Sequence, residues 1–333
     1  MRIFAVSDIH SDYAANLECL RRWSAGRKDD ALLVAGDVSD NLAILRETLG
    51  CAVERFGKVF FTPGNHDLWC TRDEAKRGWT SLDKLRAVRD VCAELGVSTG
   101  PEIFEGVLVV PLMSWYHASF DTEPDVEGVP PSRRMSVEEA MADFYRCKWP
   151  EGLTAAGGST SLAEYFDGQN TDVPAGRDGP VVSFSHFLPR LELLPEKRFL
   201  YFPPLAQAVG SHFLGRRVER LAPDVHVFGH THFAWCAKLG GCTYIQNAMA
   251  YPRERERRLA SLTLAPESTT SGADDVPCSG SPAPPTSSPS TFPQPLLVYD
   301  SERDPPVLQY TAYWSEFYRR HPRATEPTRW VYA

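Results

Sequence analysis

Short apolar runs alternate with helical patterns through the first part of the chain. A short continuous apolar run is typical of a buried strand, whereas apolar residues every three or four positions are typical of a helix that packs on a sheet. The alternation therefore predicts a sheet covered by helices. Its expected strands are residues 3–6, 31–35, 59–62 and 107–112, and its expected helices are residues 16–23, 42–55 and 81–95.

The pattern is less regular between residues 121 and 178, where Pro, Gly and Ser cluster. We expect short helices at 137–147 and 162–166, and we interpret residues 121–178 as an insertion in a single domain that spans residues 1–333. Regular elements resume with strands at 181–185 and 225–228 and a helix at 214–221 between them. A hairpin follows, with strands 234–238 and 243–246 joined across Gly240-Gly241.

Residues 266–295 are rich in Pro, Ser and Thr and contain almost no large apolar residues. Such a composition buries too little surface to offset its ordering entropy, so we expect a disordered loop. It separates two strand-like runs, 259–264 and 296–299, and we interpret it as a loop inserted in a hairpin rather than an interdomain linker. The aromatic-rich segment that follows is expected to pack back on the domain.

Composition narrows the range of partners. Hydrophobic residues make up 43% of the chain and charged residues 23%, and the net charge is -8. A negative chain is a poor match for nucleic acid or an anionic membrane, although bound cations could still attract a phosphate locally. No apolar run reaches the length of a membrane span, and the N-terminus becomes polar too soon for a signal peptide. We therefore expect a cytoplasmic protein with no nucleic-acid or membrane partner; protein partners stay unknown.

Five polar segments each directly follow a strand-like run, and residues at the carboxyl ends of strands converge on one edge of an α/β sheet. The segments mix carboxylate, imidazole and amide groups, which suits Mn, Fe or Zn better than Ca. A carboxylate at Asp37 could bridge two such ions. The segments are Asp8-Ile9-His10, Gly36-Asp37, Gly64-Asn65-His66-Asp67, Ser185-His186 and Gly229-His230-Thr231-His232.

Taken alone, each segment has an ordinary structural explanation. Asp-x-His at a strand end is usually a turn or a cap, and a single buried histidine is more often packed in the core than bound to a metal. Their shared position after five strand-like runs makes coincidence a poor explanation and favours a metal centre.

Together the five segments resemble the full signature of the calcineurin-like metallophosphoesterase family, over residues 1 to about 252. The resemblance implies a four-layer α/β/β/α sandwich and two divalent metal ions. It implies one ion held by Asp8, His10 and His232, a second held by Asn65, His186 and His230, and a bridge at Asp37. It also implies that His66 is a catalytic residue rather than a ligand, and that Asp67 orients it.

Two departures narrow the branch of the family. The protein Ser/Thr phosphatases have Asp-Arg-Gly soon after the Gly-Asp segment and end the third segment in Glu, whereas this chain has Val38-Ser39-Asp40-Asn41 and Asp67. That resembles the phosphodiesterase-like and uncharacterised small-substrate branches. Residues 246–254 also resemble a segment of uncharacterised members, and Arg253 is close enough in sequence to be a candidate phosphate contact.

The expected function is hydrolysis of a small phosphorylated substrate, either a phosphodiester or a phosphomonoester. A hydroxide that bridges two divalent ions would attack phosphorus, and His66 would serve the leaving oxygen. The alternatives are a protein phosphatase and a non-enzymatic scaffold that keeps the fold. The segment Gly96-Val97-Ser98-Thr99-Gly100 matches a hydrolase nucleophile elbow, but a predicted helix precedes it and Pro101 follows, so we expect a helix end and a turn.

Overall fold

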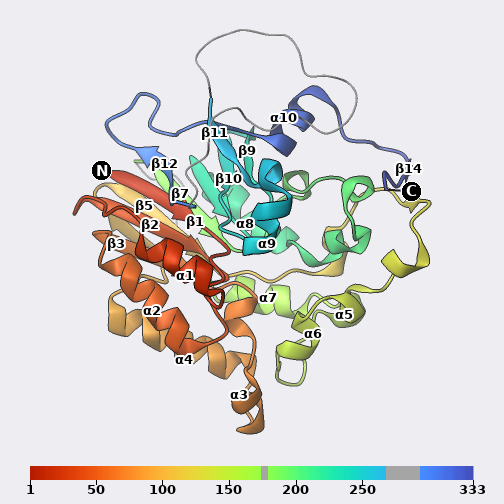
Figure 1. Cartoon of the computed structure of the whole chain (residues 1–333), viewed down its shortest axis with the longest axis horizontal. Coiled ribbons are helices and arrows are strands. Elements are labelled where there is room, and N and C mark those ends of the chain that lie inside the picture. The colour runs from red at the N-terminus through yellow and green to blue at the C-terminus, as the bar shows by residue number, and fades with distance from the viewer. Residues whose placement is uncertain (174–178, 268–292, 333) are drawn as a thin grey trace.

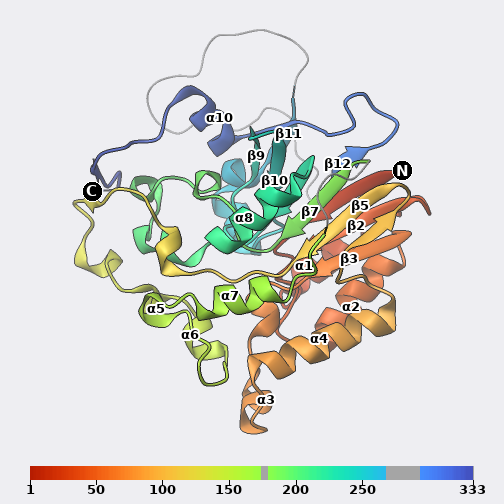
Figure 2. The same cartoon turned by 180° about the vertical axis from the view of Figure 1, so that it is seen from behind.

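The computed structural model describes residues 1–173, 179–267 and 293–332. Two β-sheets lie face to face, with helices on both outer sides, as the sequence predicts (Figures 1 and 2). Most of the predicted loop 266–295 falls outside the described residues. Within them, no helix combines the length and the apolar character that crossing a lipid bilayer requires.

The first sheet contains the three parallel strands that the N-terminal pattern predicts, with a fourth strand antiparallel at the edge. Its order is β12 (Leu296–Asp300), β1 (Arg2–Val6), β2 (Asp30–Ala35) and β3 (Lys58–Thr62). Helices α1 (Ala14–Arg21), α2 (Leu42–Val53) and α4 (Ser81–Leu95) cover its outer face (Figure 1). Short α3 (Arg72–Lys76) projects from the body of the molecule (Figure 2).

The second sheet has six strands, of which the four central ones are parallel. Its order is β4 (Glu102–Phe104), β5 (Val107–Leu112), β7 (Val181–Ser185), β8 (Val225–Phe228), β10 (Cys242–Gln246) and β9 (Trp235–Leu239). The outer face of this sheet is packed by α8 (His212–Leu221) through Leu214 and Val218. The expected hairpin is present as the antiparallel pair β9–β10.

The main core lies between the two sheets. Alternating residues of the central strands point inward and are fully buried, among them Ile3, Leu33, Phe60, Phe184 and Val227. Helix boundaries follow local chemistry as well: Asn41 accepts hydrogen bonds at the start of α2, and α4 begins with a capping box at Thr80. Gly96, with φ 70°, ends α4, which confirms the predicted helix end there.

Residues 121–173 and the C-terminal segment contain short elements. They are β6 (Val126–Glu127), α5 (Val137–Ala140), α6 (Asp143–Arg146), α7 (Ser161–Gly168), β13 (Tyr310–Ala312), α10 (Tyr313–Arg320) and β14 (Thr328–Arg329). The insertion as such stays a prediction. The C-terminal segment does pack on the domain: Trp330 is 7% exposed, and β14 pairs with β6.

Two predictions about these elements are wrong. The single helix at 137–147 is split into α5 and α6 because Met141 is extended, with φ -88° and ψ 126°, and the split turns Asp143 inward. The hairpin of 259–264 with 296–299 does not form. Residues Leu259–Leu262 are a 3₁₀ turn, and β11 (Leu264–Pro266) pairs with β13, while β12 pairs with the free edge of β1.

Candidate metal centre and substrate cleft

Five loops meet at one edge of the sandwich, because they follow β1, β2, β3, β7 and β8, which are all parallel within their sheets. Backbone hydrogen bonds join the loops directly. The amide of His10 donates to the carbonyl of Asp37 at 2.9 Å, and the amide of Gly229 donates to that of His186 at 2.9 Å. We call the seven predicted ligands on these loops the metal edge: Asp8, His10, Asp37, Asn65, His186, His230 and His232.

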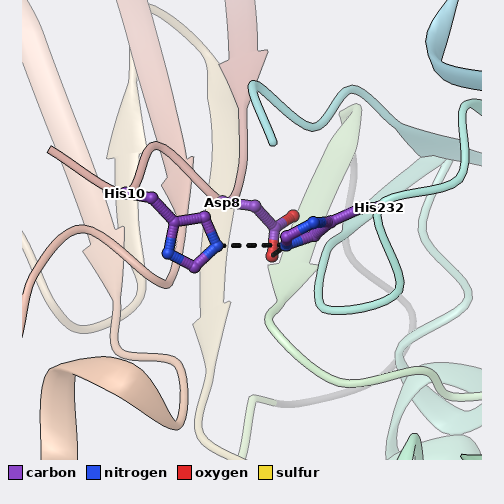
Figure 3. A group of neighbouring side chains, drawn as sticks. All are labelled: Asp8, His10 and His232. Atoms are coloured by element: carbon purple, nitrogen blue, oxygen red, sulfur yellow. Dashed lines mark hydrogen bonds and ion pairs between the residues drawn. The ribbon is translucent and has the colours of Figure 1, made fainter. Parts of the chain in front are cut away.

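The first ligand group of the metal edge consists of Asp8, His10 and His232, whose ligand atoms all lie within 4.8 Å of one another. Figure 3 shows the three side chains converging from two separate loops. The Nε2 atoms of His10 and His232 are 3.0 Å apart, and the Nε2 of His232 is 3.3 Å from a carboxylate oxygen of Asp8. All three are buried.

The second ligand group consists of Asp37, His186 and His230, joined by the amide oxygen of Asn65. That oxygen is 3.0 Å from the Nε2 of His186 and 3.1 Å from the Nδ1 of His230. Asp37 lies between the groups, with one oxygen 3.4 Å from the Nε2 of His186 and the other 4.0 Å from that of His10. The structure therefore brings all seven predicted ligands together, with Asp37 central.

The backbone of the metal edge adopts a conformation that non-glycine residues rarely adopt. Asp8, His10, Asp37, His230 and His232 all have φ between 45° and 73°. Such strain persists only where the surroundings hold it, and it gathers at functional sites. The metal edge is the place where this chain concentrates it.

Two glycines allow the loops to approach so closely. A Cβ at Gly64 would lie 2.2 Å from a carboxylate oxygen of Asp37, and a Cβ at Gly36 would lie 2.5 Å from the Nδ1 of His186. Only glycine fits at either position, which explains the Gly-Asp and Gly-Asn pairs in the sequence.

The outward nitrogen of three histidines is held by another group, which leaves the inward nitrogen free for a ligand bond. The Nδ1 of His186 donates to the carbonyl of Ala35 at 3.0 Å, and the Nε2 of His230 donates to that of Ala208 at 2.8 Å. The Nδ1 of His232 lies 2.6 Å from the carboxylate of Glu254. Such partners are typical of histidines that bind metals, because they fix the tautomer and the ring orientation.

Glu254 and Asp143 contact residues of the metal edge, and the sequence alone did not point to either contact. Asp143 accepts from the side-chain amide of Asn65 at 2.9 Å and so turns the oxygen of Asn65 toward the second ligand group. The same carboxylate accepts from the indole of Trp69 and the hydroxyl of Tyr116. In the sequence, Asp143 stands within the expected helix 137–147, and Glu254 stands in a run of alternating charges.

The predicted role of Asp67, to orient His66, stays a prediction, and the structure shows a further task for its carboxylate. Both of its carboxylate oxygens accept backbone amides, from Asp37, Val38, Ser39 and Gly64, at 2.8 to 3.0 Å. These bonds hold the loops after β2 and β3 together. The ring of His66 is stacked on Trp69, with centroids 3.6 Å apart, and its Nε2 is 3.5 Å from the hydroxyl of Tyr251.

The family model for calcineurin-like phosphoesterases matches residues 1–234, which include the whole metal edge. The chain belongs to this family. A curated relative, the acyl-carrier-protein phosphodiesterase PptH of Mycobacterium tuberculosis, is 27% identical over 276 residues, which are 77% of this chain and 80% of the relative. The crystal structure of phosphopantetheinyl hydrolase (PptH) from Mycobacterium tuberculosis has the same fold, with a TM-score of 0.59 at 23% identity, over 77% of this chain and 92% of that one.

As a calcineurin-like phosphoesterase, the chain is a metal-dependent hydrolase of phosphoric esters. Electrostatics of the metal edge fit that activity. Burial lowers the pKa of His186 to about 3 and that of His10 well below its usual value, so both imidazoles are neutral. Burial, together with Asp67 and Asp8, raises the pKa of Asp37 well above its usual value. Although burial lowers the pKa of His232, Asp8 and Glu254 outweigh it and raise this pKa to about 9.

These pKa shifts are those of a site that suits divalent cations. Crowded, desolvated carboxylates are costly unless a positive charge offsets them, and the neutral imidazoles of His10 and His186 present lone pairs. A bound cation would displace the proton that the raised pKa of His232 keeps on that ring at neutral pH. The donor set of two carboxylates, four imidazoles and one amide oxygen fits borderline first-row ions, and the outer partners of the histidines are already in place. The residues of this phosphoesterase therefore fit the metal ions that its family uses.

A cleft of about 620 Å³ opens beside the metal edge. One side is formed by Asp37, Asn65, His66, His230 and His232. The other side is mostly aromatic, and we call it the aromatic wall: Phe199, Tyr201, Phe202, Phe233, Tyr313, Trp314 and Tyr332. Arg253, the candidate phosphate contact, is exposed and does not line this cleft, whereas Arg258 does.

Proposed function

We propose that this phosphoesterase is a phosphodiesterase that releases a phosphopantetheinyl group from a carrier protein. The observation that carries the proposal is the pair of neighbouring ligand groups, with Asp37 between them, beside a cleft of about 620 Å³. Such a site can act on a phosphodiester, and the cleft offers space for an organic group attached to phosphorus. The names of the relative and of the similar crystal structure supply the substrate class.

In this proposal, Asp8, His10 and His232 would hold one divalent ion, Asn65, His186 and His230 would hold the other, and Asp37 would serve both. The ions are Mn, Fe or Zn, as the mixed donor set favours. When bound, they supply Lewis acidity and a water of lowered pKa. Glu254, Ala208 and Ala35 keep the histidines in the tautomers that such binding needs.

His66 serves the leaving oxygen by donating a hydrogen bond or a proton from its ring. It lines the cleft on the side of the metal edge, and its side chain is 17% exposed, so a substrate can reach it. Stacking on Trp69 fixes the plane of the ring. His66 also lies close enough to His10 and Asp37 to form a third group of possible ligand atoms, and metal content distinguishes the two roles.

The test is an assay of three substrates with Mn²⁺, Zn²⁺ and Fe²⁺: a phosphopantetheinylated acyl carrier protein, bis(p-nitrophenyl) phosphate and p-nitrophenyl phosphate. Release of phosphopantetheine, followed by mass spectrometry, supports the full proposal, and it should vanish in Asp37→Ala. Hydrolysis of the diester alone leaves a phosphodiesterase with a different substrate. Hydrolysis confined to the monoester contradicts the proposal.

A further inference from the structure

We propose that the aromatic wall binds the organic group on one side of the scissile phosphate, and that this group is an extended, uncharged chain. The inference rests on the proposed phosphodiesterase activity, and it concerns the selection of substrate rather than the hydrolysis itself.

The aromatic wall is continuous with the metal edge. Phe233 directly follows the ligand His232, and its ring lies 6.3 Å from that of Trp314 on α10. Trp314 in turn lies 5.3 Å from Phe199 and 5.1 Å from Tyr313. Tyr313 is 39% exposed. Aromatic faces beside a phosphate site therefore remain available to a bound chain.

A second link joins the wall side of the cleft to the ligands. Pro203–Ala208 form a 3₁₀ turn that carries Leu205 into the cleft lining and presents the carbonyl of Ala208 to the Nε2 of His230. One short segment thus contacts both the organic side of the cleft and the second ligand group. A chain bound along the wall would lie next to the ions.

The wall is held in place by the C-terminal segment. The indole of Trp330 donates to the carbonyl of Leu200 at 2.9 Å in a buried bond, and the amide of Glu196 donates to the hydroxyl of Tyr318 at 2.7 Å. The amide of Ala324 donates to the carboxylate of Glu196 at 2.9 Å. A surface fixed before binding loses less entropy when a ligand binds, as a specificity site requires.

The charged residues that line the cleft distinguish between charged and uncharged substrate groups. Apart from Asp37 and the histidines, the charged groups that line the cleft are Glu254 and Arg258, which form an ion pair at 2.6 Å. Arg258 also lies over the ring of Phe233, at 5.1 Å from its centroid. Arg133 and Arg198 lie over the rings of Tyr201 and Phe199 but do not line the cleft. The lining itself therefore offers no unpaired arginine to a second phosphate or to a carboxylate, which favours an uncharged chain over a nucleoside polyphosphate.

The size of the cleft points to the same conclusion. About 620 Å³ is in the range of small-molecule sites, so the cleft takes a flexible arm and leaves a folded carrier outside. The chemical class is a phosphodiester with a long, neutral arm on one oxygen.

The probes are p-nitrophenyl phosphodiesters whose second group is methyl, hexyl or a hexyl chain that ends in a carboxylate. For the native protein loaded with Mn²⁺, we expect kcat/KM for the hexyl diester to exceed that for the methyl diester by roughly tenfold or more, because buried methylenes add binding energy. The carboxylate-ended chain should lose most of this advantage. Absence of metal-dependent hydrolysis of the methyl diester would overturn the phosphodiesterase proposal itself. Hydrolysis with no preference for hexyl would overturn only the role of the wall.

Two substitutions locate the effect. Trp314→Ala and Tyr313→Ala should each lower the hexyl-to-methyl ratio of kcat/KM, mainly through KM for the hexyl diester. Tyr145→Ala is the matched control, because Tyr145 is 61% exposed and lies outside the cleft lining. Tyr313→Ala keeps the test decisive if Trp314→Ala fails to fold, since Tyr313 is partly exposed. A ratio that neither variant lowers, in proteins with native melting temperatures, would contradict the proposal.

Discussion

The two sides of the cleft are built in different ways. The metal edge follows the ends of five parallel strands, with strained backbone at Asp8, His10, Asp37, His230 and His232. The aromatic wall comes from 3₁₀ turns, a loop and the C-terminal segment. Strand ends give fixed positions for chemistry, whereas short connecting segments can change without disturbing the sheets.

The comparison with the family follows this division only in part, because Phe199, Tyr201, Phe202 and Phe233 of the wall lie inside the matched residues. The family match ends at residue 234, just after the last ligand, His232. Tyr313, Trp314 and Tyr332 of the wall lie beyond it. The shared part of the chain therefore contains the hydrolytic residues, and the segment after the match contributes to the surface that we assign to substrate selection.

The largest effect is expected from Asp37, the carboxylate that lies between the two ligand groups. Asp37→Ala should reduce metal-dependent diester hydrolysis on the order of 10⁴-fold, because it removes the central carboxylate. Metal analysis should fall from two ions to one or fewer. Asp29→Asn, an exposed carboxylate before β2, is the control and should keep both. Two ions retained in Asp37→Ala would show that this carboxylate does not join the groups.

Chemistry can be separated from metal binding at His66. His66→Ala should keep its metal content and lose kcat by roughly 10²–10⁴-fold with a poor leaving group such as phenolate, because a positioned donor is removed. The loss should be smaller with p-nitrophenolate, which needs little protonation. A variant that loses an ion would instead make His66 a ligand.

A substitution at Glu254 tests whether the hydrogen bond to the ligand His232 supports metal binding. Glu254→Gln removes the charge beside the Nδ1 of His232 and should weaken metal affinity by roughly 10–100-fold, measured by competition with a chelator. Glu256→Gln on the same helix, α9 (Pro252–Arg257), is exposed and should leave affinity unchanged. Equal affinities in the two variants would remove Glu254 from the metal site.

Substitutions that loosen the aromatic wall should lower the free energy of unfolding and leave metal binding intact. Trp330→Phe leaves the carbonyl of Leu200 without its buried partner and should cost about 1–3 kcal/mol in denaturant unfolding. Tyr332→Phe removes an exposed bond to Phe199 and should cost less. A lower metal content in Trp330→Phe would mean that the two sides are not independent.

The smallest expected effect is on the dependence of stability on acidic pH. Burial lowers the pKa of His226 to about 3, and its ring is bonded to Ser183 and Ser185 beneath the metal edge. Below about pH 6.5 the unfolded chain binds a proton that the folded chain does not, so stability falls as pH falls, by up to about 1.4 kcal/mol per pH unit from this residue. His226→Gln should flatten the dependence of unfolding free energy on pH between 6.5 and 5, in chelator. An unchanged slope would mean that His226 is not neutral in the folded protein.

The metal edge could be predicted from the sequence because its residues stand in short segments directly after apolar strands. Asp37 needs only its own strand and its neighbouring glycine to be recognised. Asp143 depends on a contact with Asn65, 78 residues away, and on a helix break at Met141 that no local pattern signals. For Asp67, adjacency to His66 in sequence suggests a contact with that ring, but it gives no sign of the four backbone amides that donate to its carboxylate.

The layered fold was equally accessible, since the strand and helix periodicities are strong through residue 112. The pairing of β12 could not be predicted. This strand could pair either with the expected strand 259–264 or with the free edge of β1, and the choice depends on how the whole sheet assembles. The wall could not be foreseen for the same reason. Phe199 and Trp314 look like ordinary core aromatics until the C-terminal segment is placed.

Each ligand group draws on both sheets, and this has a consequence for how the chain folds. Asp8 and His10 follow the first sheet and His232 the second, and His10 and His232 are 222 residues apart in sequence. An ion held between them would be a cross-link across the sandwich that closes a very long loop of the chain. No nascent chain can form it before residue 232 has left the ribosome. Because ions that bind only the assembled sandwich stabilise it by mass action, metal supply during synthesis should set how much of the protein stays folded.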